Sequence, residues 1–469
     1  MKTLGIDSST QGVKALVRDA ATGRVTAASS VGFGKDLPAY GCPDGFLPNA
    51  DPRVRRTDPR LWLAALDLVL ARLSAVCDLS EVAAIGGDGQ QHGSVCLNAG
   101  WDGALKSVAG GAKGEARLVD IFKGVFSRDE SPIWMDSSTT AEVRELDRLF
   151  PDLQARTGSP AVERFTGPQL MKFAAEHPAD WERTVRVHLV SSFLCSVLAG
   201  ADAPIDTGDG AGMNLLDLGK GAWAADICAA VAPDLLAKLP SVFLPGGRTT
   251  LALAPYFAKY GFRPGIPVVP FTGDNPASLV GTGADRPGVA VISLGTSDTF
   301  FAALPGFRTD PAGYGHVFGN PSGGCMSLAC FKNGSLAREK VRAKIGCDYT
   351  FFDETAWAGA DGANPLAFPY FEPEITPVHD ATGIEADFDW EAAPADVKVR
   401  SIVTGQVENM YERTRWIGSF ETIRVTGGAS RSKGIRGAIA AVFGAKVEVL
   451  DVPDSAALGG AMLAARAVG

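Results

Sequence analysis

Hydrophobic and polar residues along the first hundred positions follow the periods of short strands and one helix. Apolar-rich runs over residues 2–7, 13–18 and 24–31 predict three strands, and a Ser/Thr/Gly turn joins the first two into a hairpin. Apolar residues then recur at helical spacing from 61 to 73, after a Thr-Asp-Pro helix start. A further apolar run over 82–85 predicts the next strand, which ends in a glycine-rich segment. The predicted order is therefore hairpin, strand, helix and strand.

The second half of the chain repeats this order. Residues 288–294 and 299–304 predict two strands around the turn 295–298, which is similar to the turn after residue 7. Later runs predict a strand over 422–425, a helix over 433–443, a strand over 446–450 and a closing helix from residue 454. The repeat predicts a duplicated α/β fold. The prolines between residues 249 and 270 place the division there, which gives domains of residues 1–254 and 255–469.

The overall composition indicates which class of protein this is but does not indicate a reaction. The 469 residues are 46% hydrophobic and 21% charged, which is typical of globular domains. A net charge of −9, without a long basic tract, argues against nucleic acid as a partner. No apolar run is long enough to span a membrane, the start does not resemble a signal peptide, and the eight cysteines are scattered. We therefore expect a cytoplasmic protein.

Three turns rich in glycine and hydroxyl residues have the composition of phosphate-binding loops. They cover residues 8–12, 295–298 and 426–430, and they offer backbone N–H groups, hydroxyls and close approach at glycine. The chain has no GxxxxGK[ST] loop, and no GxGxxG motif follows its first strand. Asp7 ends the first strand beside the first turn. A carboxylate there can hold Mg²⁺ through water molecules, or it can simply cap the turn.

Two further segments carry side chains suited to a sugar. Asp274 and Asn275 stand between an apolar strand and a small-residue helix. A carboxylate at a rigid strand end can accept the proton of a hydroxyl group, although a helix-capping aspartate has the same local pattern. Gln90, Gln91 and His92 lie between glycines at another strand end, where paired donors and acceptors suit polyol recognition.

Long motifs give the chain a resemblance to a known family. The FGGY carbohydrate kinases have similar segments at 90–94, 133–140, 163–167, 212–216, 273–279, 293–299, 330–336 and 426–430, so the resemblance covers nearly the whole chain. It implies two duplicated actin/hexokinase-type (ribonuclease H-like) ATPase domains with a cleft between them, the first binding sugar and the second nucleotide. It also implies ATP-dependent phosphorylation of a ketopentose, D-xylulose to D-xylulose 5-phosphate, with Mg²⁺ as a cofactor.

The resemblance assigns roles to individual residues. Asp274 is expected to be the catalytic base, and the ketose is expected to contact His92, Arg164, Asp274, Asn275 and Gln91. The residues expected at the nucleotide are Asp7, Thr10, Gln11, Gly295, Thr296, Gly427, Gly428, Ser432 and Tyr349. Trp357 is the alternative to Tyr349 on the adenine side. Mg²⁺ is expected at Asp7, with water between the ion and the carboxylate.

Two alternative functions stay open at this point. A kinase for a neighbouring sugar such as ribulose, or for a polyol, would have the same types of contact, because the sequence does not show which stereochemistry they read. A noncatalytic, actin-like nucleotide-binding protein would share the phosphate turns but would not need the pair Asp274 and Asn275. A homodimer is also left open.

Overall fold

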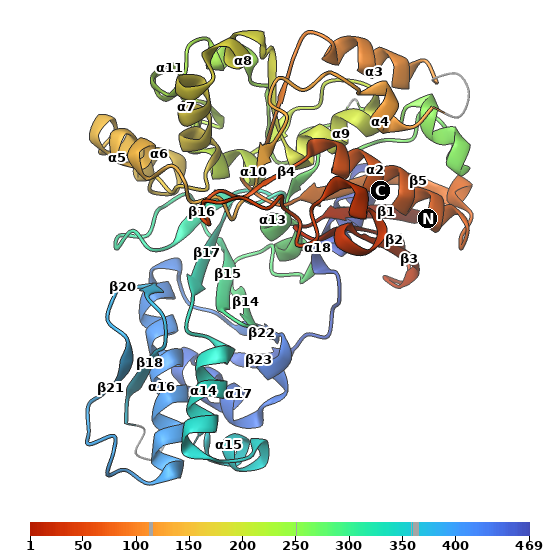
Figure 1. Cartoon of the computed structure of the whole chain (residues 1–469). Helices are drawn as coiled ribbons and strands as arrows, with labels where there is room; N and C mark the ends of the chain where they lie inside the picture. The colour runs from red at the N-terminus through yellow and green to blue at the C-terminus, as the bar shows by residue number, and fades with distance from the viewer. Residues whose placement is uncertain (112–115, 250, 358, 360–364) are drawn as a thin grey trace. The chain divides into compact units, whose positions relative to one another are not determined.

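The computed structural model describes the chain except for residues 112–115, 250, 358 and 360–364, and it divides into two compact units (Figure 1). Unit 1 contains Met1–Gly281, Phe318–Gly324 and Asp454–Gly469, and unit 2 contains Thr282–Val317 and Cys325–Pro453. The division at residues 254 and 255 that the sequence indicates differs from this one, and it stays a prediction about domains. The C-terminal segment thus belongs to the same unit as the first strand.

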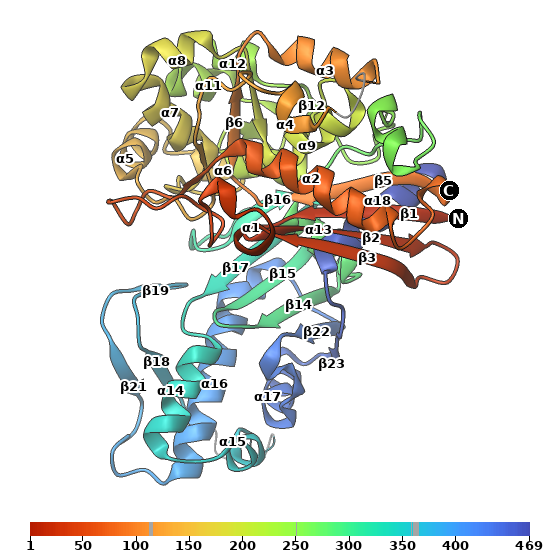
Figure 2. The ribbon, with the colours of Figure 1, turned by 45° about the vertical axis from the view of Figure 1, so that its right-hand side comes forward.

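Unit 1 is built on a five-stranded sheet in the order β13-β5-β1-β2-β3. Its strands are β1 (Lys2–Ser8), β2 (Gly12–Asp19), β3 (Val25–Gly32), β5 (Val82–Gly89) and β13 (Thr272–Gly273). The first three form an antiparallel meander, and β5 and β13 continue the sheet in parallel with β1. Helix α2 (Pro59–Ser74) lies along one face of this sheet (Figure 2) and begins after the Asp58 cap, as the Thr-Asp-Pro motif predicts.

The opposite face of this sheet is covered by α18 (Ser455–Val468), which packs along α13 (Asp274–Gly281). Because side chains alternate along a strand, Ile6 faces the core beneath α2 while position 5 faces α18. A Cβ on Gly5 would lie only 1.8 Å from the carbonyl oxygen of Ala457. The last helix of the chain therefore touches the backbone of the first strand.

Shorter elements complete unit 1, and a second apolar core that includes Leu170 and Phe173 holds several of them together. The helices are α1 (Phe33–Asp36), α3 (Trp101–Ala109), α4 (Leu118–Ile121), α5 (Thr140–Leu149), α6 (Leu153–Thr157), α7 (Thr166–Glu176), α8 (Pro178–Arg183), α9 (Val190–Ala199), α10 (Thr207–Gly210), α11 (Ala225–Val231) and α12 (Leu235–Lys238). The strands are β4 (Arg56–Thr57), β6 (Ser94–Leu97), β7 (Ser131–Pro132), β8 (Arg186–Leu189), β9 (Ile205–Asp206), β10 (Leu216–Asp217), β11 (Ala222–Trp223) and β12 (Val242–Phe243).

Unit 2 repeats the topology of the first sheet. Its strands are β14 (Val289–Leu294), β15 (Asp298–Leu304), β17 (Cys325–Phe331), β22 (Thr422–Thr426) and β23 (Lys446–Val449), and the short strand β16 (His316–Gly319) is divided between the two units. The strands β14, β15 and β17 form an antiparallel meander, and β22 and β23 continue in parallel with β14. The order β17-β15-β14-β22-β23 matches β3-β2-β1-β5-β13, so the duplicated α/β fold predicted from the sequence is confirmed.

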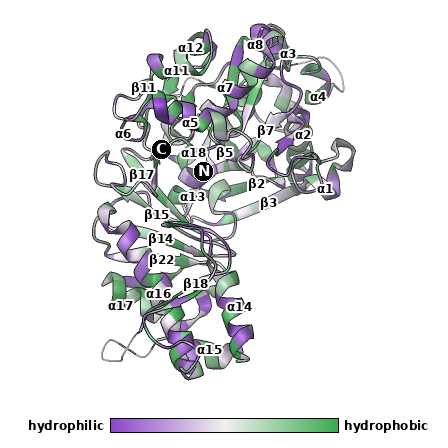
Figure 3. Cartoon of the chain, turned by 60° about the vertical axis from the view of Figure 1, so that its left-hand side comes forward, coloured by the Kyte–Doolittle hydropathy of each residue, from purple (hydrophilic) through white to green (hydrophobic). Residues whose placement is uncertain are grey.

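The helices of unit 2 are α14 (Ser335–Ile345), α15 (Tyr349–Thr355), α16 (Ala395–Thr414) and α17 (Lys433–Phe443), and its hairpins pair β18 (Ala367–Tyr370) with β21 (Gly383–Ala386) and β19 (Glu374–Ile375) with β20 (Val378–His379). Helix α17 is largely hydrophobic, whereas α14 is largely hydrophilic (Figure 3). Phe443 of α17 stacks on Phe300 of β15, with ring centroids 5.8 Å apart. Among the described helices, none combines the length and apolar character that crossing a membrane requires.

Candidate functional site

A hollow of about 290 Å³ opens in unit 1 where β1 ends and both α13 and α18 begin. Its lining residues are Asp7, Ser9, Lys14, Asp274, Asn275, Ser278, Asp454, Ser455 and Ala456. Helix N-termini carry partial positive charge and unpaired N–H groups, which favour negative groups nearby. Of the residues predicted for sugar and Mg²⁺, Asp7, Asp274 and Asn275 therefore share one hollow.

Asp274 is the first residue of α13, directly after the two-residue strand β13. Its Oδ1 accepts hydrogen bonds from the backbone N–H of Asn275 at 2.8 Å and from the Asn275 side-chain amide at 3.0 Å. Loss of solvation in this hollow, and then the nearby charge of Asp7, raise the pKa of Asp274 to about 7. A carboxyl group with a pKa near neutrality can accept a proton and release it again, which suits a general base.

Hydrogen bonds connect Asp274 to the segment that follows β5. The Asn275 amide donates to Oε1 of Gln91 at 2.9 Å, and Nε2 of Gln91 donates to the carbonyl oxygen of Gly208 at 3.3 Å. Gly273 gives Gln91 its room, because a Cβ there would lie 2.5 Å from the Gln91 side chain. Three of the residues predicted for the sugar thus form one hydrogen-bonded group.

His92 and Arg164 both lie near the ring of Phe165. Nδ1 of His92 lies 2.8 Å from the carbonyl oxygen of Gly212, so Nδ1 is the donor of that bond. The imidazole stacks on the ring of Phe165 with centroids 4.2 Å apart, and the Arg164 guanidinium carbon lies 5.7 Å from the centroid of the same ring. The structure therefore brings these two predicted residues into one local cluster of unit 1.

Asp7 has a buried acidic neighbour that the sequence analysis did not single out. The parallel register pairs Asp7 of β1 with Asp88 of β5. Asp88 is fully buried, and its carboxyl group forms a hydrogen bond with the carboxyl group of Asp7. Burial raises the pKa of both carboxyl groups. In both strands an aspartate stands one residue before the end of the strand and follows an apolar run, which is the sequence signal that could have found Asp88.

The position of Asp7 allows a test of whether the site suits Mg²⁺. Mg²⁺ takes oxygen ligands and usually keeps several of its waters beside one or two carboxylates. In the described parts of the chain, no group of three or more His, Cys, Asp or Glu side chains could enclose a metal ion. Asp7 lines the hollow and Asp88 does not, so the site fits a largely hydrated Mg²⁺ beside Asp7 and not a fully enclosed ion.

Two other residues predicted for the nucleotide, Thr10 and Gln11, lie around the first turn but do not line the hollow. Thr10 is partly buried, and its hydroxyl accepts a hydrogen bond from Nε1 of Trp134 at 2.7 Å. The Gln11 side chain is exposed, and neither residue lines the hollow. Trp134, which the sequence analysis mentioned only within a motif, is 44% exposed. Asp209 was also missed: it is fully buried, accepts a hydrogen bond from Ser191, and has a raised pKa because of that burial.

Unit 2 contains a separate hollow of about 770 Å³, within the size range of ligand pockets. Gly295 and Thr296 line it from the turn between β14 and β15, and Gly428 and Ser432 line it from the segment between β22 and α17. Tyr349 of α15 lines it as well. Five of the residues predicted for the nucleotide thus share one hollow.

Gly427 and Ser432 belong to the segment between β22 and α17, and Ser432 lines this hollow. Gly427 has a φ of 88°, and a Cβ on it would lie 2.5 Å from the carbonyl oxygen of Leu294, so the turn passes close to β14. The hydroxyl of Ser432 accepts a hydrogen bond from the N–H of Ile435 at 3.1 Å and donates one to Asp353. Ser432 therefore caps α17, and its hydroxyl is already engaged.

The two aromatic residues predicted for the adenine side differ in position. Tyr349 is 65% exposed, its hydroxyl donates to Glu339 at 3.0 Å, and the Arg342 guanidinium carbon lies 4.1 Å from its ring centroid. Trp357 packs against α17 instead, where a Cβ on Gly437 would lie 3.1 Å from its ring. Of the two, only Tyr349 is among the residues that line the hollow.

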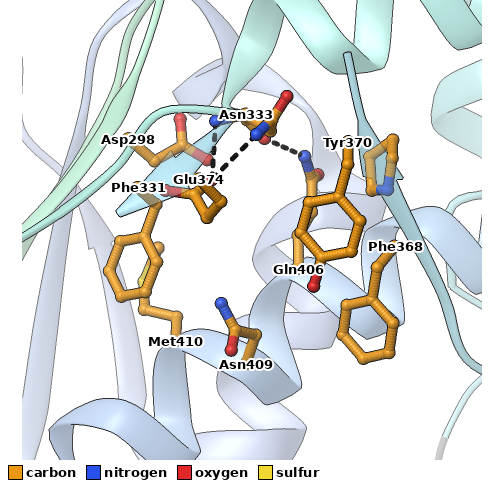
Figure 4. A pocket seen from close by; sticks show the side chains of 10 residues that line it. Asp298, Phe331, Asn333, Phe368, Tyr370, Glu374, Gln406, Asn409 and Met410 are labelled. Carbon is orange, nitrogen blue, oxygen red and sulfur yellow. Dashed lines mark hydrogen bonds between the residues drawn. The ribbon is translucent and has the colours of Figure 1, made fainter. Parts of the chain in front are cut away.

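A buried network of hydrogen bonds and one ion pair stabilises the turn 295–298 through Asp298. Arg338 of α14 donates to the two carboxylate oxygens of Asp298 at 2.7 and 2.9 Å, and to Gln406 at 2.9 Å. The Gln406 side chain donates to the backbone carbonyl oxygen of Asn333. The side-chain amide of Asn333 in turn donates to Glu374 at 3.0 Å (Figure 4). The cavity between them is about 30 Å³, which is room for ordered water only. The network is therefore a support and not a second ligand site.

Both parts of the chain match one known family. The N-terminal domain of the FGGY family of carbohydrate kinases matches residues 130–281, and the C-terminal domain of that family matches residues 290–468. The chain belongs to the FGGY family of carbohydrate kinases. Membership makes the protein a carbohydrate kinase and sets aside the noncatalytic nucleotide-binding protein as an alternative.

Relatives of this kinase extend over almost its whole length. It is 41% identical to a xylulose kinase of Rattus norvegicus over 474 residues, which cover 98% of this chain and 87% of the relative. It is 37% identical to xylulose kinase 2 of Arabidopsis thaliana, with 98% and 86% covered. In fold it resembles a xylulose kinase of Bifidobacterium adolescentis, with a TM-score of 0.81 at 23% identity and coverage of 100% and 93%. A glycerol kinase of Plasmodium falciparum, solved with ADP, has a TM-score of 0.78 at 16% identity and coverage of 100% and 89%.

Proposed function

We propose that this carbohydrate kinase transfers the γ-phosphoryl group of ATP to D-xylulose and releases D-xylulose 5-phosphate and ADP. The observation that carries the choice of sugar is the 41% identity to the Rattus norvegicus xylulose kinase over 98% of the chain. The connected group of Asp274, Asn275 and Gln91 supports a polyhydroxylated acceptor, because it offers a carboxylate and amides within one hollow region.

In this proposal Asp274 acts on the terminal hydroxyl of the sugar. The hydroxyl oxygen forms a bond to the γ-phosphorus, the bond from that phosphorus to the bridging oxygen of ADP breaks, and the hydroxyl proton passes to the Asp274 carboxylate. Because the transition state of phosphoryl transfer is loose, Asp274 serves by orienting the hydroxyl as well as by accepting its proton. Asn275, Gln91, His92 and Arg164 bind the remaining oxygen atoms of the ketose.

The hollow of unit 2 is proposed to hold ATP. Its volume of about 770 Å³ and its glycine and hydroxyl turns support this assignment, with Gly295, Thr296, Gly427 and Gly428 near the phosphates and Tyr349 near the base. Mg²⁺, when bound, would neutralise phosphate charge, and Asp7 would hold it through water, with Thr10 nearby. We also propose a reducing, cytoplasmic setting, because the eight cysteines are scattered along the sequence without a CxxC pair.

A sugar panel tests the choice of substrate. ADP release, followed by a coupled assay, should be faster with D-xylulose than with D-ribulose or a pentitol at equal concentrations. Equal rates with D-xylulose and D-ribulose would remove the assignment of the sugar and leave a ketopentose kinase.

A substitution at the base tests the mechanism. Asp274→Asn should lose turnover by about 10³-fold or more while the protein still binds ATP, because the amide cannot accept the proton. Asp102→Asn, on an exposed turn of α3, is the matched control and should leave turnover unchanged. Turnover retained in Asp274→Asn would contradict the proposed base.

A further inference from the structure

A buried carboxyl group at the end of β9, that of Asp206, joins two elements next to the proposed base. Its Oδ2 accepts a hydrogen bond from the backbone N–H of Gly208 at 3.1 Å, and its Oδ1 accepts one from that of Asp209 at 3.0 Å. The side chain of Thr272, in β13, also donates to this carboxyl group. One carboxyl group therefore connects the start of α10 to β13.

Both of these elements lead to the group around the proposed base. Asp274 follows β13 directly. On the other side, the carbonyl oxygen of Gly208 accepts a hydrogen bond from Gln91, whose own oxygen accepts one from Asn275. We propose that Asp206 is a positioning residue, which holds the Asp274 carboxyl group and its amide partners in a fixed arrangement for phosphoryl transfer. The inference rests on the role of Asp274 in the proposed function and not on the identity of the sugar.

The contacts form a closed ring of covalent and hydrogen bonds. The ring runs along the chain from Asp206 to Gly208, by hydrogen bonds through Gln91 to Asn275, and along the chain back to Thr272, which bonds to Asp206. In a closed ring, each member restrains its neighbours from both sides, so loss of one bond loosens all of them. Removing the carboxyl group of Asp206 would open the ring at the link between α10 and β13.

Close packing inside the ring leaves little room for another arrangement. A Cβ on Gly208 would lie 2.5 Å from Oγ1 of Thr272 and 3.1 Å from Cβ of Pro276. It would also lie 2.9 Å from Oδ2 of Asp206. Thr272 and Pro276 stand two residues before and two residues after Asp274 in the chain. Helix α10 therefore lies against the chain on both sides of the proposed base.

The protonation state of Asp206 suits this role. Burial raises the pKa of Asp206 to about 6, and the three donors oppose that rise. At pH 7.5 most of these carboxyl groups are ionised, so both oxygens can accept hydrogen bonds. Positioning matters for the rate, because a displacement of about 1 Å at reacting groups can cost about 100-fold.

Steady-state kinetics of Asp206→Ala, with Asp58→Ala as the matched control, tests the inference. Asp58 caps α2 in the same unit, and its carboxylate bonds to Arg60 and not to the site. Both variants lose an aspartate cap, so both should show a similar, small fall in unfolding temperature. Only Asp206→Ala should lower kcat with the sugar, by about tenfold or more, while the KM for ATP changes less than twofold. Wild-type kcat in Asp206→Ala, or an equal loss in Asp58→Ala, would overturn the inference.

A double-mutant cycle tests the link between Asp206 and Thr272. Thr272→Val keeps the shape of the side chain and removes its hydroxyl, so it should lower kcat on its own. It should have no further effect in the Asp206→Ala background, because the bond is already absent there. Additive losses would contradict the ring. Asp206→Ser, which keeps a capping hydroxyl but has no second oxygen, replaces the alanine variant if that variant does not fold.

Hydrogen–deuterium exchange tests the arrangement without sugar or nucleotide. The backbone N–H groups of residues 272–275 should exchange about tenfold faster or more in Asp206→Ala than in wild type, because the segment is no longer tied to α10. In Asp58→Ala they should exchange at the wild-type rate. Unchanged exchange in Asp206→Ala would show that Asp206 does not hold this segment.

The outcomes for the two proposals are separable. If D-xylulose is phosphorylated equally well by wild type and Asp206→Ala, the positioning role fails and the proposed function stands. If another sugar of the panel is phosphorylated in place of D-xylulose, and Asp206→Ala is impaired with that sugar, the choice of sugar fails and the positioning role stands.

Discussion

Aspartates in unit 1 differ in the hydrogen-bond donors that surround them, and this difference separates their roles. Asp274 receives two hydrogen bonds from Asn275 on one oxygen. Asp206 receives two backbone N–H groups at the start of α10, and burial still raises its pKa to about 6. Asp88 is fully buried and shares a hydrogen bond with the carboxyl group of Asp7, and burial raises its pKa. One residue type thus provides the proposed base, a helix cap and a buried acid pair within one unit.

The pKa of Asp274 predicts how the reaction depends on pH. A base must be deprotonated to accept a proton, and the pKa of Asp274 is raised to about 7. The sugar kcat/KM should therefore be constant above pH ~8 and fall about tenfold for each pH unit below ~6.5, as the protonated fraction grows. Initial rates between pH 5.5 and 9, with circular dichroism at each pH to confirm folding, would test this. A flat profile down to pH 5.5 would contradict it.

The proposed sugar contact of His92 can be tested with a substitution that is compatible with its backbone conformation. Its φ of 70° is left-handed, which asparagine tolerates much better than alanine. His92→Asn should raise the KM for D-xylulose about tenfold or more, because the imidazole is lost, and should change the KM for ATP less than twofold. Steady-state kinetics with each substrate varied in turn gives both values. A larger change in the KM for ATP than in the KM for D-xylulose would contradict the assignment of His92 to the sugar.

Polar residues at strand ends were the part of the site that sequence reasoning found from local patterns. Asp274, Asn275, Gln91 and His92 all follow an apolar strand. Hydrogen bonds join Asp274, Asn275 and Gln91, and His92 stacks on Phe165. Asp88 escaped because its importance comes from Asp7, a residue 81 positions earlier, and only the parallel register of β1 and β5 places them together. Pairing between distant strands is not encoded in either strand alone.

At the scale of elements, the repeated meander was predictable and the packing of the last helix was not. The strand, turn and strand around residues 7 and 294 have the same local pattern, which is why the duplication was visible in the sequence. Helix α18 is an amphipathic, small-residue helix by its own pattern, and nothing in that pattern names β1 and β5 as its partners. The glycines that permit the contact stand at the other end of the chain.

Gly5 provides a test of this helix-on-strand contact. Gly5→Ala places a methyl group 1.8 Å from a backbone oxygen of α18, so it should lower the free energy of unfolding by about 3 kcal/mol or more. Gly103→Ala is the matched control, because a Cβ there meets nothing within 4 Å and alanine favours the helix by about 0.5–1 kcal/mol. Urea unfolding of both variants measures the difference. Equal stability of Gly5→Ala and wild type would rule out the close contact.

At the scale of the whole molecule, the chain begins and ends in the same compact unit. Unit 1 includes Met1–Gly281 and Asp454–Gly469, and unit 2 is the stretch inserted between them apart from Phe318–Gly324. The sequence could not reveal this. The proline cluster near residue 255 indicates a boundary between two segments, but it does not indicate that the C-terminal residues pack in the first unit. A domain cut from the sequence at residue 254 would lack both α13 and α18.

Truncation tests whether unit 1 needs the packing of α18 against its sheet. A chain that stops at Pro453 loses α18 and exposes the face of β1, β2 and β5 that this helix covers. We expect such a chain to be insoluble or to unfold at least about 10 °C lower than wild type, whereas removal of Gly469 alone should change little. Soluble yield and circular dichroism during heating measure both. An unchanged unfolding temperature after truncation at Pro453 would show that unit 1 does not need α18.

The contribution of Asp454, Ser455 and Ala456 to the hollow that contains Asp274 has a consequence during protein synthesis. A ribosome adds roughly 5–20 residues per second, so β1 emerges tens of seconds before α18 is translated. Until residues 454–468 are synthesised, the face around Gly5 has no covering helix and the hollow lacks three of its lining residues. A nascent chain that stops before residue 454 therefore has an incomplete hollow, and the proposed phosphoryl transfer has to wait for the segment that completes it.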